Sequence, residues 1–278
     1  MKTIKILNPE WQGFGVNNLA SGGALTIYKA FKQGQQFTKI NVLKNKELSI
    51  EAGILERSSI IKNSKNTFKE LSLIKPDSIF MIGGTCGAEI APVAYLNNHY
   101  ESDLAILWFD AHGDLNTPKT SLSGHFHGMV LRTLLGEGDP DLVKLIVTPL
   151  IPSQITLAGV RDLDVEEKKY ISKENITIIS PEMLTNFSLL AEAINHSGSS
   201  NIYIHIDVDF FNPCNFTGSQ VPVFGGITVE KFTSILSKLN SSYNIVGISI
   251  VEFVSQNLPM ALRIRDMFDK SGVALHLV

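Results

Sequence analysis

The sequence predicts an α/β protein in which a mostly parallel sheet is covered by helices on both faces. Short apolar runs alternate along the chain with longer segments that carry apolar residues at three- and four-residue spacing. The runs are almost continuously apolar, as strands buried on both faces must be. With 44% hydrophobic residues in 278, the chain can bury roughly three quarters of its unfolded surface. No repeat, low-complexity segment or linker divides it, so residues 1–278 predict a single domain.

The expected strands are apolar runs bounded by turn or polar residues. They cover residues 4–7, 78–84, 103–109, 154–160, 175–180, 201–209, 244–252 and 272–278.

The expected helices lie between several of these runs, at 91–100, 164–173, 181–196 and 228–240. Pro181 and Thr228 stand at plausible helix starts. Because strands that alternate with helices form a parallel sheet, a ligand site is expected at the carboxyl ends of the strands.

Composition excludes several classes of partner and compartment. The formal charge is −3, so the chain shows no excess of positive charge that would favour binding to nucleic acid or an anionic membrane. There is no apolar run of 18 residues, and the start MKTIKILNPEW lacks the pattern of a signal peptide. Two cysteines, Cys86 and Cys214, are too few for a disulfide framework and fit a reducing compartment. We therefore expect a cytoplasmic protein with no nucleic-acid or membrane partner.

The end of the third apolar run carries three polar residues at alternate positions, Asp110, His112 and Asp114. Side chains at this spacing share one face of an extended chain. Converging carboxylates require a bound cation, a basic partner or a raised pKa, and residues 108–116 contain no Lys or Arg. A solvated turn with a helix-capping Asp is the alternative for this motif taken alone.

Other strand ends are acidic too. Asp207 and Asp209 repeat the alternate spacing, and Glu252 ends the run at 244–252. Four aspartates and an imidazole are oxygen and nitrogen ligands that suit Mn²⁺, Mg²⁺ or a similar hard ion. Carboxylates that bridge two ions build two-metal sites. Together these strand ends favour a shared metal site.

Four blocks of the sequence resemble the ureohydrolases, and within them the arginases. FDAHGDLNTPKTSLSGHFHG (109–128) resembles a block in which DAHxDxNTP is followed by SGNxHG. GVRDLDVEE (159–167) resembles GLRDVDxxE, and HIDVDFFNP (205–213), with a later Gly-Gly pair, resembles SFDVDxxDP. IVEF (251–254) resembles the segment with the guanidinium-binding glutamate. The order and spacing of the four blocks make the resemblance to the family specific, and the DLNTP and SGHFHG segments resemble arginases and not the agmatinase version.

The resemblance implies a three-layer α/β/α fold and hydrolysis of a guanidinium, L-arginine above all, to urea and an amine. The nucleophile would be a hydroxide that bridges two Mn²⁺ ions. Glu252 matches the carboxylate that pairs with the guanidinium, and His127 matches the histidine that gives a proton to the leaving amine. The matched metal ligands are Asp110, His112, Asp114, Asp207 and Asp209.

The resemblance also assigns the amino-acid end of the substrate. Asn116 and Ser123 match positions that bind its carboxylate, and Asp162 and Asp164 match positions that bind its amino group. Turn chemistry is the alternative for Asn116 and Ser123, and a helix N-cap is the alternative for the two aspartates. His125 stands where the family pattern SGNxHG has asparagine.

The main departure from the family is Cys86, in GGTCG, where the pattern GGDHS has a metal-binding histidine. Because a thiolate is soft, we expect Cys86 to bind Mn²⁺ poorly; it is a substituted ligand, a weak one, or a small packed residue. His205 would share a face with Asp207 and could compensate, although a satisfied strand histidine is the favoured interpretation. The implied cofactor is Mn²⁺, one or two ions per chain, with another divalent metal as the alternative.

Two other departures concern the substrate pocket. Asn212 replaces the second Asp of DxxDP, and SQVP (219–222) replaces TGTP. Two functions therefore stay open: an active hydrolase of arginine or of another guanidino or formimino compound, and an arginase-like binding or regulatory module with an impaired metal site. The resemblance further implies a homo-oligomer, a trimer or a hexamer.

Overall fold

A computed structural model describes residues 2–32, 34–43 and 48–273. Its main feature is an eight-stranded sheet with the order β2-β1-β5-β10-β9-β6-β7-β8, in which every pairing is parallel. A short antiparallel pair, β3 with β4, lies apart from it. The strands are β1 (Thr3–Asn8), β2 (Thr38–Lys39), β3 (Ile50–Glu51), β4 (Ile54–Leu55), β5 (Ser78–Gly83), β6 (Ala105–Phe109), β7 (Ile155–Ala158), β8 (Thr177–Ile179), β9 (Asn201–Asp207) and β10 (Asn244–Val251).

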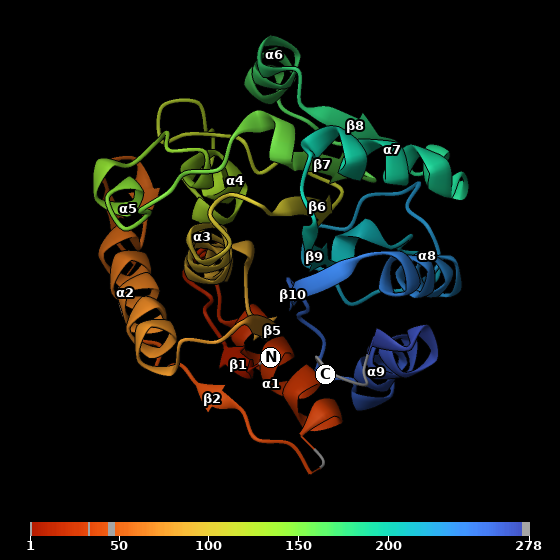
Figure 1. Ribbon diagram of the computed structural model, residues 1–278. Coiled ribbons are helices and arrows are strands. Elements are labelled where there is room, and N and C mark those ends of the chain that lie inside the picture. The colour runs from red at the N-terminus through yellow and green to blue at the C-terminus, as the bar shows by residue number, and fades with distance from the viewer. Residues whose placement is uncertain (1, 33, 44–47, 274–278) are drawn as a thin grey trace.

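Helices cover both faces of the sheet, as Figure 1 shows: α2, α3 and α4 lie on one side, and α1, α9, α8 and α7 on the other. The helices are α1 (Leu19–Phe31), α2 (Arg57–Ile74), α3 (Ile90–His99), α4 (Val130–Leu134), α5 (Pro140–Val143), α6 (Val165–Glu174), α7 (Phe187–Ser197), α8 (Val229–Ser242) and α9 (Leu258–Ser271). The predicted fold class is confirmed. Among the described helices, none has the length and apolar character needed to cross a membrane.

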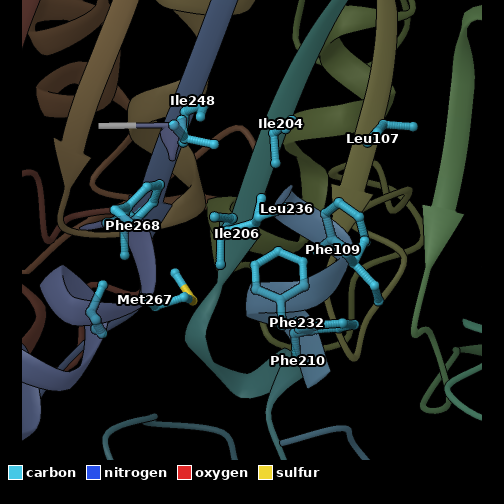
Figure 2. Packing of buried hydrophobic residues seen from close by; sticks show 14 of the residues in the cluster. Leu107, Phe109, Ile204, Ile206, Phe210, Phe232, Leu236, Ile248, Met267 and Phe268 are labelled. Carbon is cyan, nitrogen blue, oxygen red and sulfur yellow. The ribbon is translucent and has the colours of Figure 1, made fainter. Parts of the chain in front are cut away.

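The core is divided by the sheet into two apolar clusters, one on each face. In the cluster under α8 and α9, aromatic rings of Phe109, Phe210 and Phe232 meet edge to face, with centroids 4.8–5.3 Å apart. Figure 2 shows them beside β6 and β9, with Met267 and Phe268 of α9 near β10. Close packing on both faces fixes the strands, so the residues that follow the strands are held on a rigid frame.

Most of the expected elements are present, and one helix start needs correction. The seven expected strands up to residue 252 all form, whereas the run at 272–278 falls largely outside the described residues. Thr228 caps α8 by accepting a hydrogen bond from the backbone N–H of Lys231. The helix start at Pro181 was wrong, because Asn186 caps the helix and accepts from Ser188 N–H, while residues 183–185 form a separate 3-10 turn.

Candidate metal centre and active site

The acidic strand ends meet where β5, β10, β9 and β6 lie side by side in the sheet. Asp110, His112 and Asp114 follow β6, Asp207 ends β9 and Asp209 follows it, and Glu252 follows β10. Cys86 follows β5 in a 3-10 turn, Cys86–Glu89. The structure thus brings the predicted metal ligands together at the carboxyl edge of the sheet, as parallel strands require.

One half of the cluster contains His112, Asp110 and Asp209. His112 Nδ1 lies 3.0 Å from Asp209 Oδ2 and 3.5 Å from Asp110 Oδ1. Burial works to lower the pKa of His112, but its contacts with Asp110 and Asp209 outweigh burial and raise it to about 12. Burial and the charge of Asp110 raise the pKa of Asp209 to about 6. These three side chains each present an atom to one common point that suits a cation.

The other half contains Cys86 and shares Asp110 with the first. Cys86 Sγ lies 3.4 Å from Asp207 Oδ2, and the thiol is buried. One set of converging atoms joins Cys86, Asp110, Asp114 and His205, and a second joins Cys86, Asp207 and Glu252. Burial, followed by the charge of Asp114, raises the pKa of the Cys86 thiol. Without a cation this half holds more negative charge than its surroundings balance.

Two buried oxygens support a bound cation. Asp114 Oδ2 and Glu252 Oε2 have no hydrogen-bond partner among the described residues. Burial and the charge of Asp110 raise the pKa of Asp114. Both residues also hold left-handed backbone, with φ of 52° for Asp114 and 60° for Glu252, which costs energy in a residue with a side chain. Strained, unpaired, buried carboxylates are the donors that one or two divalent cations would satisfy, so these residues fit a metal centre.

Glu252 lies between the metal cluster and His127. Its Oε1 accepts a hydrogen bond from Cys86 N–H at 2.9 Å and lies 3.4 Å from His127 Nδ1. The basic residues nearest to Glu252 in the sequence, Arg263 and Arg265, would be its partners if its role were structural. Instead, Arg263 donates to the carbonyl of Asn215, and Arg265 donates to the carbonyl of Ala30. No Lys or Arg within the described ranges pairs with Glu252.

A cavity of about 360 Å³ opens above this cluster. His112, Asp114 and Asp207 lie along it on the metal side, and His127 lies beside them. The predicted substrate-binding residues line it as well: Asn116, Ser123, His125, Asp162 and Asp164. One cavity therefore joins the metal side to the positions predicted to bind the amino-acid end of the substrate. Glu252 is not among its lining residues and reaches it beside His127.

A model of the Arginase family matches residues 16–259. The chain belongs to the arginase family. An arginase of Staphylococcus aureus strain MRSA252 is 32% identical over 212 residues, which cover 73% of this chain and 70% of that enzyme. An arginase of Bacillus caldovelox is 33% identical over 179 residues, or 62% of this chain and 60% of that one. The protein is thus an arginase-family hydrolase that acts on carbon–nitrogen bonds of linear amidines.

Solved structures of the family share the fold. The arginase of Entamoeba histolytica, crystallised with L-ornithine, superimposes with a TM-score of 0.86 at 21% identity over 97% of both chains. The formimidoylglutamase of Bacillus subtilis superimposes with a TM-score of 0.74 at 18% identity over 98% of this chain and 86% of that one. At these identities the structural similarity establishes the three-layer fold. The substrate has to be inferred from the residues of the site.

The residues predicted to bind substrate are partly bonded to one another in this arginase-family chain. Asn116 Nδ2 donates to Asp164 Oδ2 at 2.8 Å, and Thr120 donates to Asn116 Oδ1 at 2.9 Å. Ser123 Oγ accepts from the backbone N–H of His125 at 3.2 Å. Asp162 is exposed at the rim, 4.0 Å from His112 Nε2. Asn116 and Asp164 are therefore held as a pair before substrate arrives, which lowers the entropic cost of binding.

The capping alternative for Asp164 also holds. Asp164 is the N-cap of α6, and its N–H donates to Glu167 Oε2 at 2.9 Å. Glu167 Oε1 meanwhile accepts from Leu115 N–H, so Glu167 ties the loop after β6 to the start of α6. Sequence reasoning missed Glu167, although a carboxylate three residues after an Asp cap is the pattern of a capping box.

Glu10 and Phe14 are further site residues that sequence reasoning missed. The Phe14 ring lies 4.8 Å from the His125 ring and 5.3 Å from the His127 ring. Glu10 is buried, accepts from Gly13 N–H at 2.7 Å and bonds the Thr85 hydroxyl. Burial raises the pKa of Glu10 to about 7. Both residues lie in an irregular segment after β1, where neither periodicity nor spacing marks a site.

Proposed function

We propose that this protein hydrolyses L-arginine to L-ornithine and urea. The observation that carries the proposal is Glu252, a buried carboxylate with one unpaired oxygen, set 3.4 Å from His127 and in a strained conformation. A carboxylate in this state is unfavourable without a cationic partner. The guanidinium group of arginine is such a partner, because its planar donors match a carboxylate.

The proposal includes Mn²⁺ as the metal. Asp110, His112 and Asp209 would hold one ion with oxygen and nitrogen donors, as a hard cation prefers. Asp110 and Asp114 reach toward a second position, next to Cys86. When bound, a pair of divalent cations lowers the pKa of a coordinated water and so supplies a nucleophile at neutral pH.

The chain's own residues orient the substrate and move the proton. Glu252 would hold the guanidinium so that its central carbon faces the metal side of the cavity, which supports the reaction by positioning. His127 lines the same cavity and lies beside Glu252, where a protonated imidazole can give its proton to the departing amine nitrogen. Phe14, against the ring of His127, limits the orientations of that imidazole.

The amino-acid end of the substrate would lie toward the rim. Asn116 and Ser123 would bind the carboxylate, and Asp162 and Asp164 the amino group. Support comes from the cavity, whose lining includes all four side chains and His127, and from the Entamoeba enzyme, whose complex contains the proposed product L-ornithine. His125 would shape the same region, with its pKa lowered by burial and by His127.

One observation favours a second function. Cys86 stands at a metal position, and a centre that holds a single ion could bind a guanidino compound without turning it over. The chain would then serve as a binding or regulatory module.

Urea release from L-arginine, with and without added Mn²⁺, separates the two functions. The enzyme proposal expects urea at a rate that rises with metal content. Agmatine and a formimino compound serve as parallel substrates. Tight arginine binding by the metal-loaded protein without urea release would support the binding module instead. The proposal also includes a cytoplasmic location and assembly into a trimer or hexamer. Light scattering of the purified protein measures the oligomeric state.

A further inference from the structure

His205 lies inside the metal cluster, on the side of Cys86. Its Nε2 is 3.9 Å from Cys86 Sγ and 3.6 Å from Asp110 Oδ2. The imidazole is fully buried and stacks on the indole of Trp108, with ring centroids 3.5 Å apart and planes inclined by 7°. Its atoms converge with those of Cys86, Asp110 and Asp114 on one point.

The other ring nitrogen of His205 is fixed by a carboxylate. His205 Nδ1 lies 2.9 Å from Glu89 Oε1, and the Tyr203 hydroxyl donates to Glu89 Oε2 at 2.6 Å. The expected satisfied strand histidine is thus present on the Nδ1 side. A carboxylate that holds Nδ1–H leaves Nε2 with its lone pair directed at the cluster, as in the carboxylate–histidine pairs that support protein-bound metals.

The remaining distances suit ligands of one ion better than hydrogen bonds. A separation of 3.6 Å between Nε2 and Asp110 Oδ2 is too long for a good hydrogen bond. Bond lengths of about 2.0 Å for nitrogen and about 2.3 Å for sulfur place two ligands of a tetrahedral ion roughly 3.6 Å apart. Cys86 Sγ and His205 Nε2, at 3.9 Å, need only a small adjustment to reach that spacing. Asp114 Oδ2, buried and unpaired, supplies a further donor.

We infer that Cys86, His205, Asp110 and Asp114 form a second metal position that prefers Zn²⁺ or Co²⁺ to Mn²⁺, with Glu89 as the residue that positions His205. The inference rests on the proposed function only in taking the cluster to be a metal centre. Two substitutions relative to the family patterns compensate each other. At residue 86, GGTCG has cysteine where the pattern has a histidine, so an imidazole is lost. At residue 205, HIDVD has histidine where SFDVD has serine, so an imidazole is gained. These two side chains are the ones in contact.

Donor chemistry gives the selectivity. Thiolate and imidazole are softer than carboxylate oxygen and favour Zn²⁺ and Co²⁺, whereas the neighbouring position has one imidazole and otherwise carboxylates. Because Asp110 belongs to both sets, the two positions would share a bridging ligand while preferring different ions. A bound divalent cation also favours the thiolate form of Cys86 over the thiol.

Cobalt provides a direct test, because a Co²⁺–thiolate bond gives a charge-transfer absorption in the near ultraviolet. The full chain is stripped of metal and titrated with Co²⁺. We expect this absorption to grow to one equivalent, to vanish in Cys86→Ser, and to persist in Cys214→Ser, the matched control at the exposed cysteine. Absence of the band from the unmodified protein, or its persistence in Cys86→Ser, would overturn the inference.

The histidine is tested by competition between Zn²⁺ and Mn²⁺, measured by metal analysis after dialysis. His205→Gln should lose the zinc equivalent and keep the other metal. Glu89→Gln should weaken zinc about 10- to 100-fold, the effect of removing a carboxylate behind a ligating histidine. His99→Gln, a partly exposed histidine on α3, is the matched control and should bind as the unmodified protein does.

Unchanged zinc affinity in a folded His205→Gln protein would overturn the assignment. If that variant does not fold, the Glu89→Gln affinity decides instead, since unchanged zinc binding there contradicts the role of His205. The readouts also separate this inference from the proposed function. A chain with the cobalt band that releases no urea contradicts only the function. A chain that releases urea with two Mn²⁺ ions and no band contradicts only the inference.

Discussion

Two buried carboxylates, Asp139 at the start of α5 and Glu252 after β10, differ in how their charge is balanced. Asp139 accepts from Arg57 Nε at 2.7 Å and Nη2 at 3.0 Å, and from the backbone N–H groups of Asp141 and Leu142. Glu252 is equally buried, yet one of its oxygens has no partner within the described chain, and the other accepts from a single N–H. Asp139 is balanced by the protein; Glu252 is not.

The difference teaches which acidic residues serve the fold and which serve a ligand. A carboxylate with a bidentate arginine and helix N–H donors has its desolvation offset inside the protein. A carboxylate without them destabilises the fold until a cation arrives. By this criterion Glu252 and Asp114 are placed to bind a ligand, and Asp139 stabilises the fold. Four predictions test the contrast, from the largest expected effect to the smallest.

Glu252→Gln should lower urea release from arginine on the order of 10³-fold, as the loss of one well-placed electrostatic contact does in other active sites. The amide keeps an oxygen for Cys86 N–H but loses the charge that pairs with a guanidinium. Metal content and melting temperature should not fall, because the replaced charge had no partner in the protein. Full-rate turnover by a folded, metal-loaded variant would refute the assigned role of Glu252.

Asp139→Ala should do the opposite: lose stability and keep activity. Removing it leaves the guanidinium of Arg57 without its bidentate partner and α5 without its N-cap, which together cost about 4 kcal/mol of unfolding free energy. Denaturant unfolding measures this loss. Urea release per folded molecule should match the unmodified protein, and a large loss of specific activity would contradict the division between the two residues.

Glu10 is a third buried carboxylate without a basic partner among the described residues, and its effect on stability should depend on pH. Its pKa is raised from 4.5 to about 7 by burial, so its contribution to stability is present below pH 4.5 and is lost as pH rises through 7. At roughly 1.4 kcal/mol per unit, that is about 3 kcal/mol. In the metal-free protein, Glu10→Gln should match the unmodified chain near pH 4.5 and be about 3 kcal/mol more stable above pH 7. Denaturant curves that run parallel across this range would show that Glu10 does not titrate there.

The exposed carboxylates at the rim should have the smallest effect. If Asp162 and Asp164 bind an α-amino group and Asn116 and Ser123 bind the carboxylate, arginine should be preferred to agmatine more than tenfold in kcat/KM. The loss of a charge-assisted contact, about 1.5–3 kcal/mol, gives this ratio. The two substrates have the same guanidinium, so Glu252 treats them alike. Equal turnover would show that the rim does not recognise the amino-acid end.

The metal-side residues were predictable because strand ends in a parallel sheet meet at one edge. Asp110 and Asp114 do reach the same cluster, although β6 ends at Phe109 and Asp114 has a positive φ, so their place after the strand counts and not the alternation of a strand. The blocks at 205–213 and 251–254 supplied the rest. The Glu89–His205 pair was not predictable, since its members are 116 residues apart and nothing local links them. Contacts between distant segments depend on tertiary packing, which cannot be read from a single sequence.

The helices show the same limit of periodicity. α8 was predicted because its buried face is apolar, with Phe232, Leu236 and Leu239. α2 was missed because its buried face is largely Ser, Asn and Thr, among them Asn63 and Thr67. α1 was missed as well, since it contains two adjacent glycines that reduce helix propensity. At one of them, Gly23, a side chain would not fit, because a Cβ there would lie 1.6 Å from the carbonyl oxygen of Phe253, next to Glu252.

The left-handed backbone of Glu252 has a consequence for how this protein changes under selection. Glycine occupies such a conformation without strain, and it would also remove a buried, unpaired charge. A population of variants enriched for thermal resistance alone should therefore drift toward Glu252→Gly early, whereas one enriched for growth on arginine as the nitrogen source should retain Glu252. Under the proposed function, position 252 would record which pressure a lineage has experienced, because stability and catalysis would favour different residues there.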